Sequence, residues 1–304
     1  MTTASNAEGL GRPTGSAVAR LSALRRRHSV QRTVWRALVY VILLAGSVFM
    51  LAPYVWMLST ALKSPAATFT FPPTWIPEPV VWANFTEALE AMQFPILLKN
   101  TLQVTVYALA GGLLTSTMVA YGFARTRFPG RNVLFLVLLA TMMLPSQVTM
   151  IPVYIIYKNL GWVDTLRPLW VGSLFGGGAF YIFLMRQFFM TLPRELDEAA
   201  AMDGCGTVAV LWRILLPLSK PALATVAIFS FMGHWNDFMT PLIYVNSIPK
   251  MTLALGLHIF RGTYQTQWNY LMAASLVVML PCLILFFLAQ NYFIQGIALT
   301  GMKA

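Results

Sequence analysis

Charge is scarce in this chain. Of its 304 residues only 10% are Asp, Glu, Lys or Arg, whereas 58% are hydrophobic, and the mean hydropathy is +0.66. A water-soluble domain carries about 25% charged residues, which excludes a soluble globular fold for most of the chain. The net charge is +11, but the basic residues gather at the ends of apolar runs, as membrane orientation requires. Membrane lipid is therefore an expected partner, and nucleic acid is not.

Sequence motifs for catalysis, metal binding and nucleotide binding are also missing. The two cysteines, Cys205 and Cys282, indicate neither a disulfide framework nor a metal site. The chain has no G-x-x-x-x-G-K-[ST] phosphate loop, no H-E-x-x-H and no G-x-S-x-G elbow. We therefore expect no catalytic residues, no metal site and no cofactor bound by this chain. An intramembrane enzyme built on His234 and Asp237 is an alternative that lacks a recognisable nucleophile.

Long apolar stretches dominate what is present. A helix that crosses the bilayer core needs about 20 apolar residues. Six stretches meet this length, at about 35–58, 98–123, 132–154, 168–190, 218–240 and 271–293. The expected fold is all-α and integral to the membrane, with a six-span domain at 34–304 behind a basic, disordered leader at 1–33. The leader and first run are not read as a signal peptide, because that run exceeds the usual apolar region of about 7–15 residues.

The distribution of basic residues predicts the orientation. With the N-terminus inside, 15 of the 21 Lys and Arg residues fall in inner segments, so the positive-inside rule places both termini in the cytoplasm. The short inner loop RTRFPGR at 125–131 carries most weight. We expect a multi-pass protein of a bacterial plasma membrane. Few ionisable residues lie inside the spans, which disfavours proton coupling.

Three other segments have distinctive patterns. Phe85, Leu89 and Met92 share one face of a short helix expected on the outer membrane surface. The tract SLFGGGAFYIF in the fourth span favours close helix packing. The outer loop from Tyr244 to Asn269 exceeds the length of about 12–15 residues above which loops are usually functional.

The segment 193–216 separates two spans and predicts a helix, a glycine bend and a second helix. Pro193 suits a first turn, three acidic residues follow it, and Gly204 can end the helix in a left-handed conformation. The second helix would carry one apolar stripe and stop at Pro217. The stripe comprises Val208, Leu211, Trp212 and Leu215. On spacing alone, an interfacial connector fits equally well.

The same segment resembles the EAA signature of ABC importer permeases. Glu198-Ala199-Ala200, three residues, Gly204, nine residues and Ile214-x-Leu216-Pro217 match it without a gap. The tracts AYGFARTRFPGR, MLPSQVTMIPVYIIYKNLGWVDT and HWNDFMTPLIY are similar to the carbohydrate-importer branch, with its maltose-type and glycerol-phosphate-type permeases. The resemblance runs from about residue 35 to the C-terminus and implies a type I ABC importer permease fold.

The resemblance also implies partners and residue roles. The segment 193–216 would be a coupling helix that docks on a separate ATPase dimer, which binds ATP and Mg²⁺. The implied docking residues are Glu198, Ala199, Ala200, Asp203, Gly204, Ile214, Leu216 and Pro217. A second homologous permease would complete the translocation path, and the 244–269 loop would meet an extracytoplasmic sugar-binding protein.

The sequence leaves the identity of the transported sugar open. Polar and aromatic candidates for the path are Gln147, Tyr181, Asn236 and Asp237, because sugars bind through hydrogen bonds and aromatic faces. Each of these also fits a purely structural role. The main alternative function is a stand-alone secondary carrier or channel for a small polar solute.

Overall fold

The computed structural model describes residues 15–262 and 266–301, with side chains described for residues 32–262 and 266–290. These residues are almost wholly helical, and the described part contains a single isolated β-bridge, between Arg261 and Thr266. The predicted all-α fold is confirmed. The chain divides into two units, residues 1–57 and 58–304.

The first unit consists mainly of helix α1 (Gly15–Ala61), which continues into the second unit for its last residues. Its apolar part, Arg32–Ala61, is long enough to cross a membrane. Residues 15–33 are helical, where the sequence predicted disorder. The reason is compositional: this tract is rich in alanine, leucine and arginine, which favour helix, and it contains no proline. Residues 1–14 of the predicted leader lie outside the described residues.

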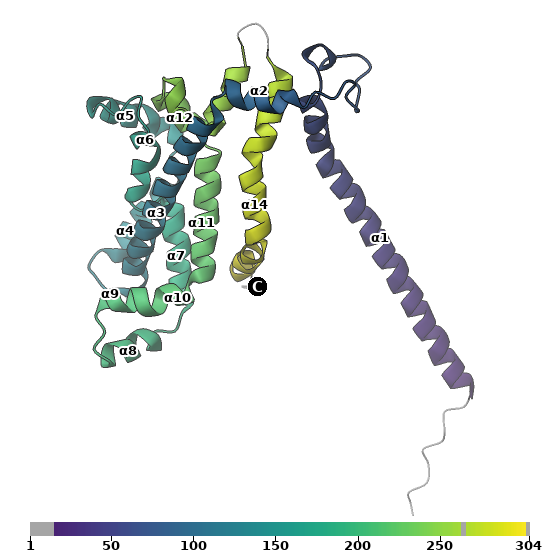
Figure 1. Cartoon of the computed structure of the whole chain (residues 1–304). Helices are drawn as coiled ribbons and strands as arrows, with labels where there is room; N and C mark the ends of the chain where they lie inside the picture. Colours follow the sequence, from purple (N-terminus) through teal and green to yellow (C-terminus); the bar gives the residue numbers. More distant parts are fainter. Residues whose placement is uncertain (1–14, 263–265, 302–304) are drawn as a thin grey trace, which may run out of the picture. The chain divides into compact units, whose positions relative to one another are not determined.

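Helix α3 (Phe94–Arg125) is the central element of the second unit and packs against α7 (Ala179–Thr191) and α11 (Lys220–Trp235) (Figure 1). Small buried residues along α3 allow this close packing; they include Ala108, Gly111, Gly112, Ser116, Ala120 and Ala124. One hydrophobic core joins the lower half of α3 to α7 and α11, around Met185, Phe189 and Val226.

The expected third span at 132–154 is not one straight helix. Helices α4 (Arg131–Thr141) and α5 (Ser146–Asn159) meet at an angle of 96°. Pro145 stands directly before α5; its missing N–H and the restriction it places on Leu144 interrupt the helical ladder. Four helices among the described residues are each long and apolar enough to cross a membrane. The number rises to six if this bent pair and a second one, 207–218 with 220–235, each count as one span.

The fourth span is also irregular. Short helix α6 (Arg167–Trp170) leads into a 3₁₀ turn, η2 (Val171–Leu174), and three glycines with positive φ precede α7. A Cβ on Gly177 would lie 2.8 Å from the Cα of Gly112 in α3. The glycine tract thus provides the close backbone approach that the sequence predicted.

The two ends of the second unit differ in structure (Figure 1). At one end lie α8 (Glu195–Met202), α9 (Thr207–Val210), the π-helical turn η3 (Leu211–Leu215) and α10 (Leu216–Leu218). We call this the α8 end. The opposite, α2 end has more short elements. They are η1 (Pro65–Ala67), α2 (Ala83–Ala91), α12 (Met239–Tyr244), η4 (Ile248–Lys250), α13 (Leu253–Gly256) and η5 (Leu257–Phe260).

The last helix, α14 (Trp268–Gly301), packs against α2 and α11. Met92 and Ala88 are fully buried beside it, and Phe85 and Leu89 are partly buried in the same core. The predicted apolar face of α2 therefore packs on the protein itself. Asn84, one turn before Ala88 on the same face, fixes this helix by donating hydrogen bonds to the carbonyls of Ala61 and Lys63, both at 2.8 Å.

Candidate functional site

Helix α8 begins where its sequence predicts. It starts two residues after Pro193, and Glu195, Asp197 and Glu198 occupy its first turn, where negative charge stabilises the helix dipole. Gly204 ends it with φ +78°. The N–H of Cys205 donates to the carbonyl of Ala200 at 2.9 Å, and that of Gly204 to the carbonyl of Ala201 at 3.0 Å. This pair of bonds is a Schellman cap, which turns the chain sharply towards α9.

One face of α8 packs on the protein and the other is bare. Ala200 is 4% exposed and packs in the core with Ala120 and Leu211. Glu198, Ala199 and Asp203 are exposed, and Met202 is 89% exposed. Of the two alanines among the implied docking residues, Ala199 therefore lies on the exposed side, whereas the methyl group of Ala200 packs against the chain's own core. We call the residues Glu198, Ala199, Met202 and Asp203 the exposed α8 face.

A charged contact ties α8 to α3. The Arg125 guanidinium, at the end of α3, donates to Asp197 Oδ2 at 2.7 Å. Its other Nη donates to the carbonyls of Phe189 and Leu192 at 2.6 and 2.7 Å. Only 4% of the Arg125 side chain is exposed. One buried cation thus satisfies the carbonyl end of α7 and holds the first turn of α8.

The second half of the segment is anchored as well. The Tyr121 hydroxyl donates to the Thr207 carbonyl at 3.1 Å. Beyond it, Val210, Leu211 and Leu215 are buried, with Ile214 partly buried, whereas Val208 and Trp212 are 68% and 44% exposed. The predicted stripe of Val208, Leu211, Trp212 and Leu215 is therefore only half right. The buried positions 210, 211, 214 and 215 keep the i, i+4 spacing of a helix face, so the buried face is rotated relative to the predicted stripe, and a π-helical turn covers 211–215.

The second helix of the 193–216 segment, which starts at Thr207, does not stop at Pro217. It continues through exposed Pro217 and partly buried Leu216 to Leu218, and then bends by 82° into α11. The bend lies at Ser219, whose hydroxyl and N–H both donate to the carbonyl of Leu215. Pro217 lies at the second position of α10, where a missing N–H is tolerated.

The four path candidates do not form a cluster. Gln147 is exposed at the start of α5, and Tyr181 packs in the core beside Phe180. Asn236 donates to the carbonyl of Met232 at 2.9 Å, and Asp237 Oδ1 accepts from the N–H of Thr240 at 3.1 Å, at the start of α12. Within the described residues no hydrogen bond joins any two of these separated positions. This local hydrogen bond of Asp237 fits the structural role given above as the alternative.

His234 takes part in packing between helices. Its Nδ1 lies 2.8 Å from the carbonyl of Ser230, and its Nε2 lies 3.2 Å from Ser173 Oγ in η2. Both ring nitrogens are therefore occupied, and neither contacts Asp237. Throughout the part of the chain that the structure describes, no group of three His, Cys, Asp or Glu side chains could hold a metal ion.

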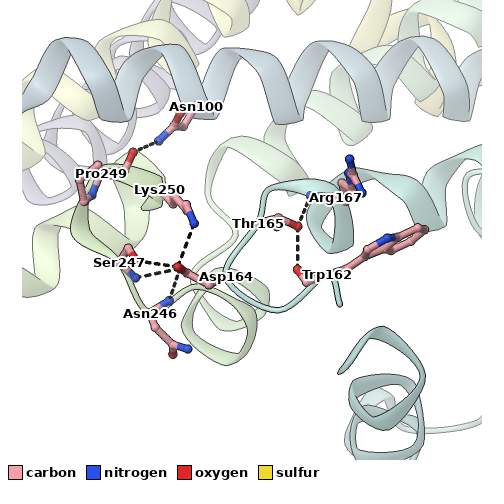
Figure 2. A network of polar contacts seen from close by, with 9 residues as sticks. All are labelled: Asn100, Trp162, Asp164, Thr165, Arg167, Asn246, Ser247, Pro249 and Lys250. Atoms are coloured by element: carbon pink, nitrogen blue, oxygen red, sulfur yellow. Dashed lines mark hydrogen bonds and ion pairs between the residues drawn. The ribbon is translucent and has the colours of Figure 1, made fainter. Parts of the chain in front are cut away.

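The 244–269 loop is folded against the α2 end, and Figure 2 shows its main polar network. Asp164 accepts from the N–H groups of Asn246 and Ser247 at 3.0 and 2.9 Å, from the Ser247 hydroxyl, and from Lys250 Nζ at 2.9 Å. These donors hold the pKa of the Asp164 carboxyl far below its usual range, with the Ser247 hydrogen bonds contributing most. The carboxylate thus fixes this loop to the α5–α6 connection.

Contacts with α3 complete the anchoring of the loop. Asn100 donates to the carbonyls of Pro249 and Met251, both at 2.9 Å, and Thr101 Oγ1 accepts from the N–H of Leu253 at 2.8 Å. Much of the loop is consequently buried. Among the loop residues that the structure describes, those left exposed are Asn246, Ile248, Pro249, Lys250, His258, Arg261, Gly262 and Gln267.

Residues 112–299, more than half of the chain, match the family described as the inner membrane component of binding-protein-dependent transport systems. The chain belongs to this family. The EAA resemblance is thereby placed within a permease component, and the anchored α8 segment lies inside the matched residues.

Several relatives of this permease component share most of its length. It is 33% identical over 87% of its length to the probable ABC transporter permease protein YurM of Bacillus subtilis, covering 88% of that protein. It is 31% identical over 91% of its length to the diacetylchitobiose uptake permease DasC of Streptomyces coelicolor, covering 99% of it. The sn-glycerol-3-phosphate permease UgpE of Yersinia pestis is 32% identical over 85% of this chain and 94% of its own.

Among solved structures, the permease component is similar to a chain of a bacterial ABC transporter that imports the acidic polysaccharide alginate. The TM-score is 0.76 at 24% identity, over 86% of this chain and 98% of that one. A second crystal structure, of a bacterial alginate transporter with its substrate-loaded periplasmic protein, gives a TM-score of 0.64 at 15% identity, over 87% and 95%. These likenesses establish the ABC importer permease fold.

Sequence reasoning missed Arg125, Tyr121, Asp164 and Asn100. Arg125 counted only as an orientation charge, although its partner Asp197 lies 72 residues away. No local pattern links such positions, so only the fold brings them together.

Proposed function

We propose that this permease component is one membrane subunit of an ATP-driven importer of carbohydrates or related polyols, and that its exposed α8 face docks on a separate ATPase subunit. The observation that carries the proposal is that one side of α8 is buried against the protein while its other side is exposed. A helix held by buried contacts on one side, with acidic and small residues bare on the other, is suited to pass a partner's movement to the spans.

The anchoring contacts connect the α8 segment to two membrane-spanning helices. Arg125 joins α8 to both α3 and α7 through one guanidinium, and Tyr121 joins α9 to α3. Displacing the exposed face would therefore move two spans together. ATP and Mg²⁺ belong to the partner in this proposal, because the chain carries no phosphate-loop motif.

The charge at the α8 end supports a cytoplasmic location for it. The basic residues there are Arg125, Arg127, Arg131, Arg194, Arg213 and Lys220. The positive-inside rule favours the cytoplasm for such short basic connections. Both termini would then lie on the cytoplasmic side, and the α2 end would face outward.

The remaining partners follow from the same arrangement. A second permease would cover part of the apolar surface that this chain leaves exposed, and an extracytoplasmic binding protein would meet the exposed residues of the 244–269 loop. The names of the relatives, which include a disaccharide and a glycerol-phosphate permease, support carbohydrates and polyol phosphates as the substrate class.

The test is a charge reversal at Glu198 in the reconstituted transporter. Glu198→Arg should lower substrate uptake by roughly tenfold or more while ATP hydrolysis by the complex continues or becomes independent of substrate. That size corresponds to losing about 1.4 kcal/mol of interaction at the docking face. The matched control is Glu90→Arg, the same change at an exposed position near the end of α2, which should leave coupling intact.

Full coupling in the Glu198→Arg transporter would reject the docking role of α8. Substrate-specific flux through liposomes that contain this chain alone would instead support a stand-alone carrier or channel.

A further inference from the structure

A basic hollow lies at the α8 end beside the start of α4. Its volume is about 500 Å³, and its charged lining consists of Arg127, Arg131 and Arg194. Gly130 and Asn132 complete its polar part, and Phe128 and Val133 its apolar part. No acidic side chain lines it. This hollow lies outside the exposed α8 face and has no part in the coupling contacts described above.

The charges of the three arginines are not neutralised by carboxylates. The neighbouring Arg125 is neutralised by Asp197, whereas Arg127, Arg131 and Arg194 have no carboxylate within ion-pair distance among residues 32–262 and 266–290. The side chain of Arg131 makes one hydrogen bond, from Nη1 to the carbonyl of Thr126 at 3.0 Å. Arg127 and Arg194 are exposed. Guanidinium groups pair with phosphate oxygens through two parallel N–H donors, so the hollow has the donors that a phosphate monoanion or diester requires.

An apolar stripe begins at the hollow's edge. Val133, Leu136 and Val137 on α4 are 66%, 69% and 56% exposed, and Phe128 is 38% exposed. They lie at the end of a candidate span, where headgroups and acyl chains meet. A soluble phosphate would use only the arginines. A phospholipid would use both parts: its phosphate in the hollow and its acyl chains along α4.

We propose that this hollow binds the phosphate of an anionic phospholipid from the leaflet at the α8 end, with the acyl chains lying on the apolar stripe of α4. Basic sites at span ends on the cytoplasmic side bind anionic headgroups in this manner. Because Arg194 directly precedes α8, a bound lipid would also hold the start of the coupling segment against the membrane surface.

The experiment measures lipid retention by the purified full-length chain with native mass spectrometry. The probes are phosphatidylglycerol and phosphatidylcholine with identical acyl chains, with inorganic phosphate as a soluble competitor. The variant is Arg127→Gln with Arg194→Gln, two exposed side chains without hydrogen bonds in the described structure. The control is Arg213→Gln, an exposed arginine at the same end but outside the hollow. Circular dichroism verifies that each variant keeps its helical content.

The double variant should bind phosphatidylglycerol about thirty-fold more weakly, because each basic residue near a membrane surface contributes about fivefold in affinity. Phosphatidylcholine binding should not change, and Arg213→Gln should match the wild type. Unchanged phosphatidylglycerol binding in the double variant would overturn the proposal. So would an equal loss for both lipids, or complete displacement of the lipid by millimolar inorganic phosphate, which would identify a soluble-phosphate site.

Discussion

At the scale of single residues, two charged side chains hold the functional segments in place. Arg125 is buried at the end of α3 and reaches α7 and α8. Asp164, in the α5–α6 connection, accepts from the outer loop and fixes it. Both act over long separations in sequence, which local patterns do not reveal. Charge-assisted hydrogen bonds of this kind are roughly twice as strong as neutral ones, so their loss should be measurable.

Arg125→Gln should destabilise the α8 end. The substitution removes the buried cation and leaves Asp197 and two helix-end carbonyls without their donor, at a cost of about 3 kcal/mol. Thermal unfolding of the purified chain in detergent measures this loss. Arg127→Gln is the matched control, since Arg127 is an exposed arginine two residues away. Equal stability of the two variants would contradict the anchoring role of Arg125.

Asp164→Asn should loosen the outer loop. The folded pKa of Asp164 lies below its unfolded value of 3.8. Its contribution is therefore fully present above pH 3.8 and is lost as pH falls through the lower, folded pKa. In the wild type, the amides of Asn246 and Ser247 should be protected from hydrogen exchange, and their protection factors should not change between pH 5 and 8. The variant should lose severalfold protection across that whole range. Wild-type protection that decays between pH 8 and 5 would contradict this assignment.

At the scale of elements, much of the helical framework could be predicted. The long apolar runs of α3 and α14, the acidic first turn of α8 and its glycine end all follow from composition and capping. The 96° bend before α5 has a local cause at Pro145, although the length of the apolar run predicted one straight span. The π-helical turn at 211–215 could not be predicted, because no local pattern in the sequence marks it. The same limit applies to Ala199 and Ala200: adjacent alanines have identical propensities, and only the packed structure assigns one to the core and one to the surface.

The bend after α8 provides a test at this scale. Gly204→Ala should cost about 1–2 kcal/mol, because its φ of +78° disfavours any residue with a Cβ. A Cβ there meets nothing within 4 Å, so the cost is conformational and Gly204→Asn should recover part of it. Gly206→Ala is the control, since Gly206 has φ −71° and is equally open. Thermal unfolding compares the three variants, and a loss for Gly206→Ala as large as that for Gly204→Ala would reject this explanation.

At the scale of the whole molecule, this permease component exposes much apolar surface, and its helix α8 is buried on one face and exposed on the other. Leu136, Phe175 and Phe287 are 69%, 85% and 66% exposed, as expected for a subunit whose surroundings are lipid and partner chains. Family membership and fold agree with this description. The central claim is that the exposed α8 face contacts the ATPase partner.

The most direct measurement is site-specific photo-crosslinking in the assembled transporter. A benzophenone attached to Ala199→Cys or Met202→Cys, in a Cys205→Ser background, should crosslink to the ATPase subunit. Ala200→Cys should resist labelling because that position is buried, and Glu90→Cys should label but not reach the ATPase. Efficient crosslinks from residues 199 and 202 to the ATPase are the predicted result. Labelled residues 199 and 202 that yield no ATPase crosslink in an active complex would contradict the account.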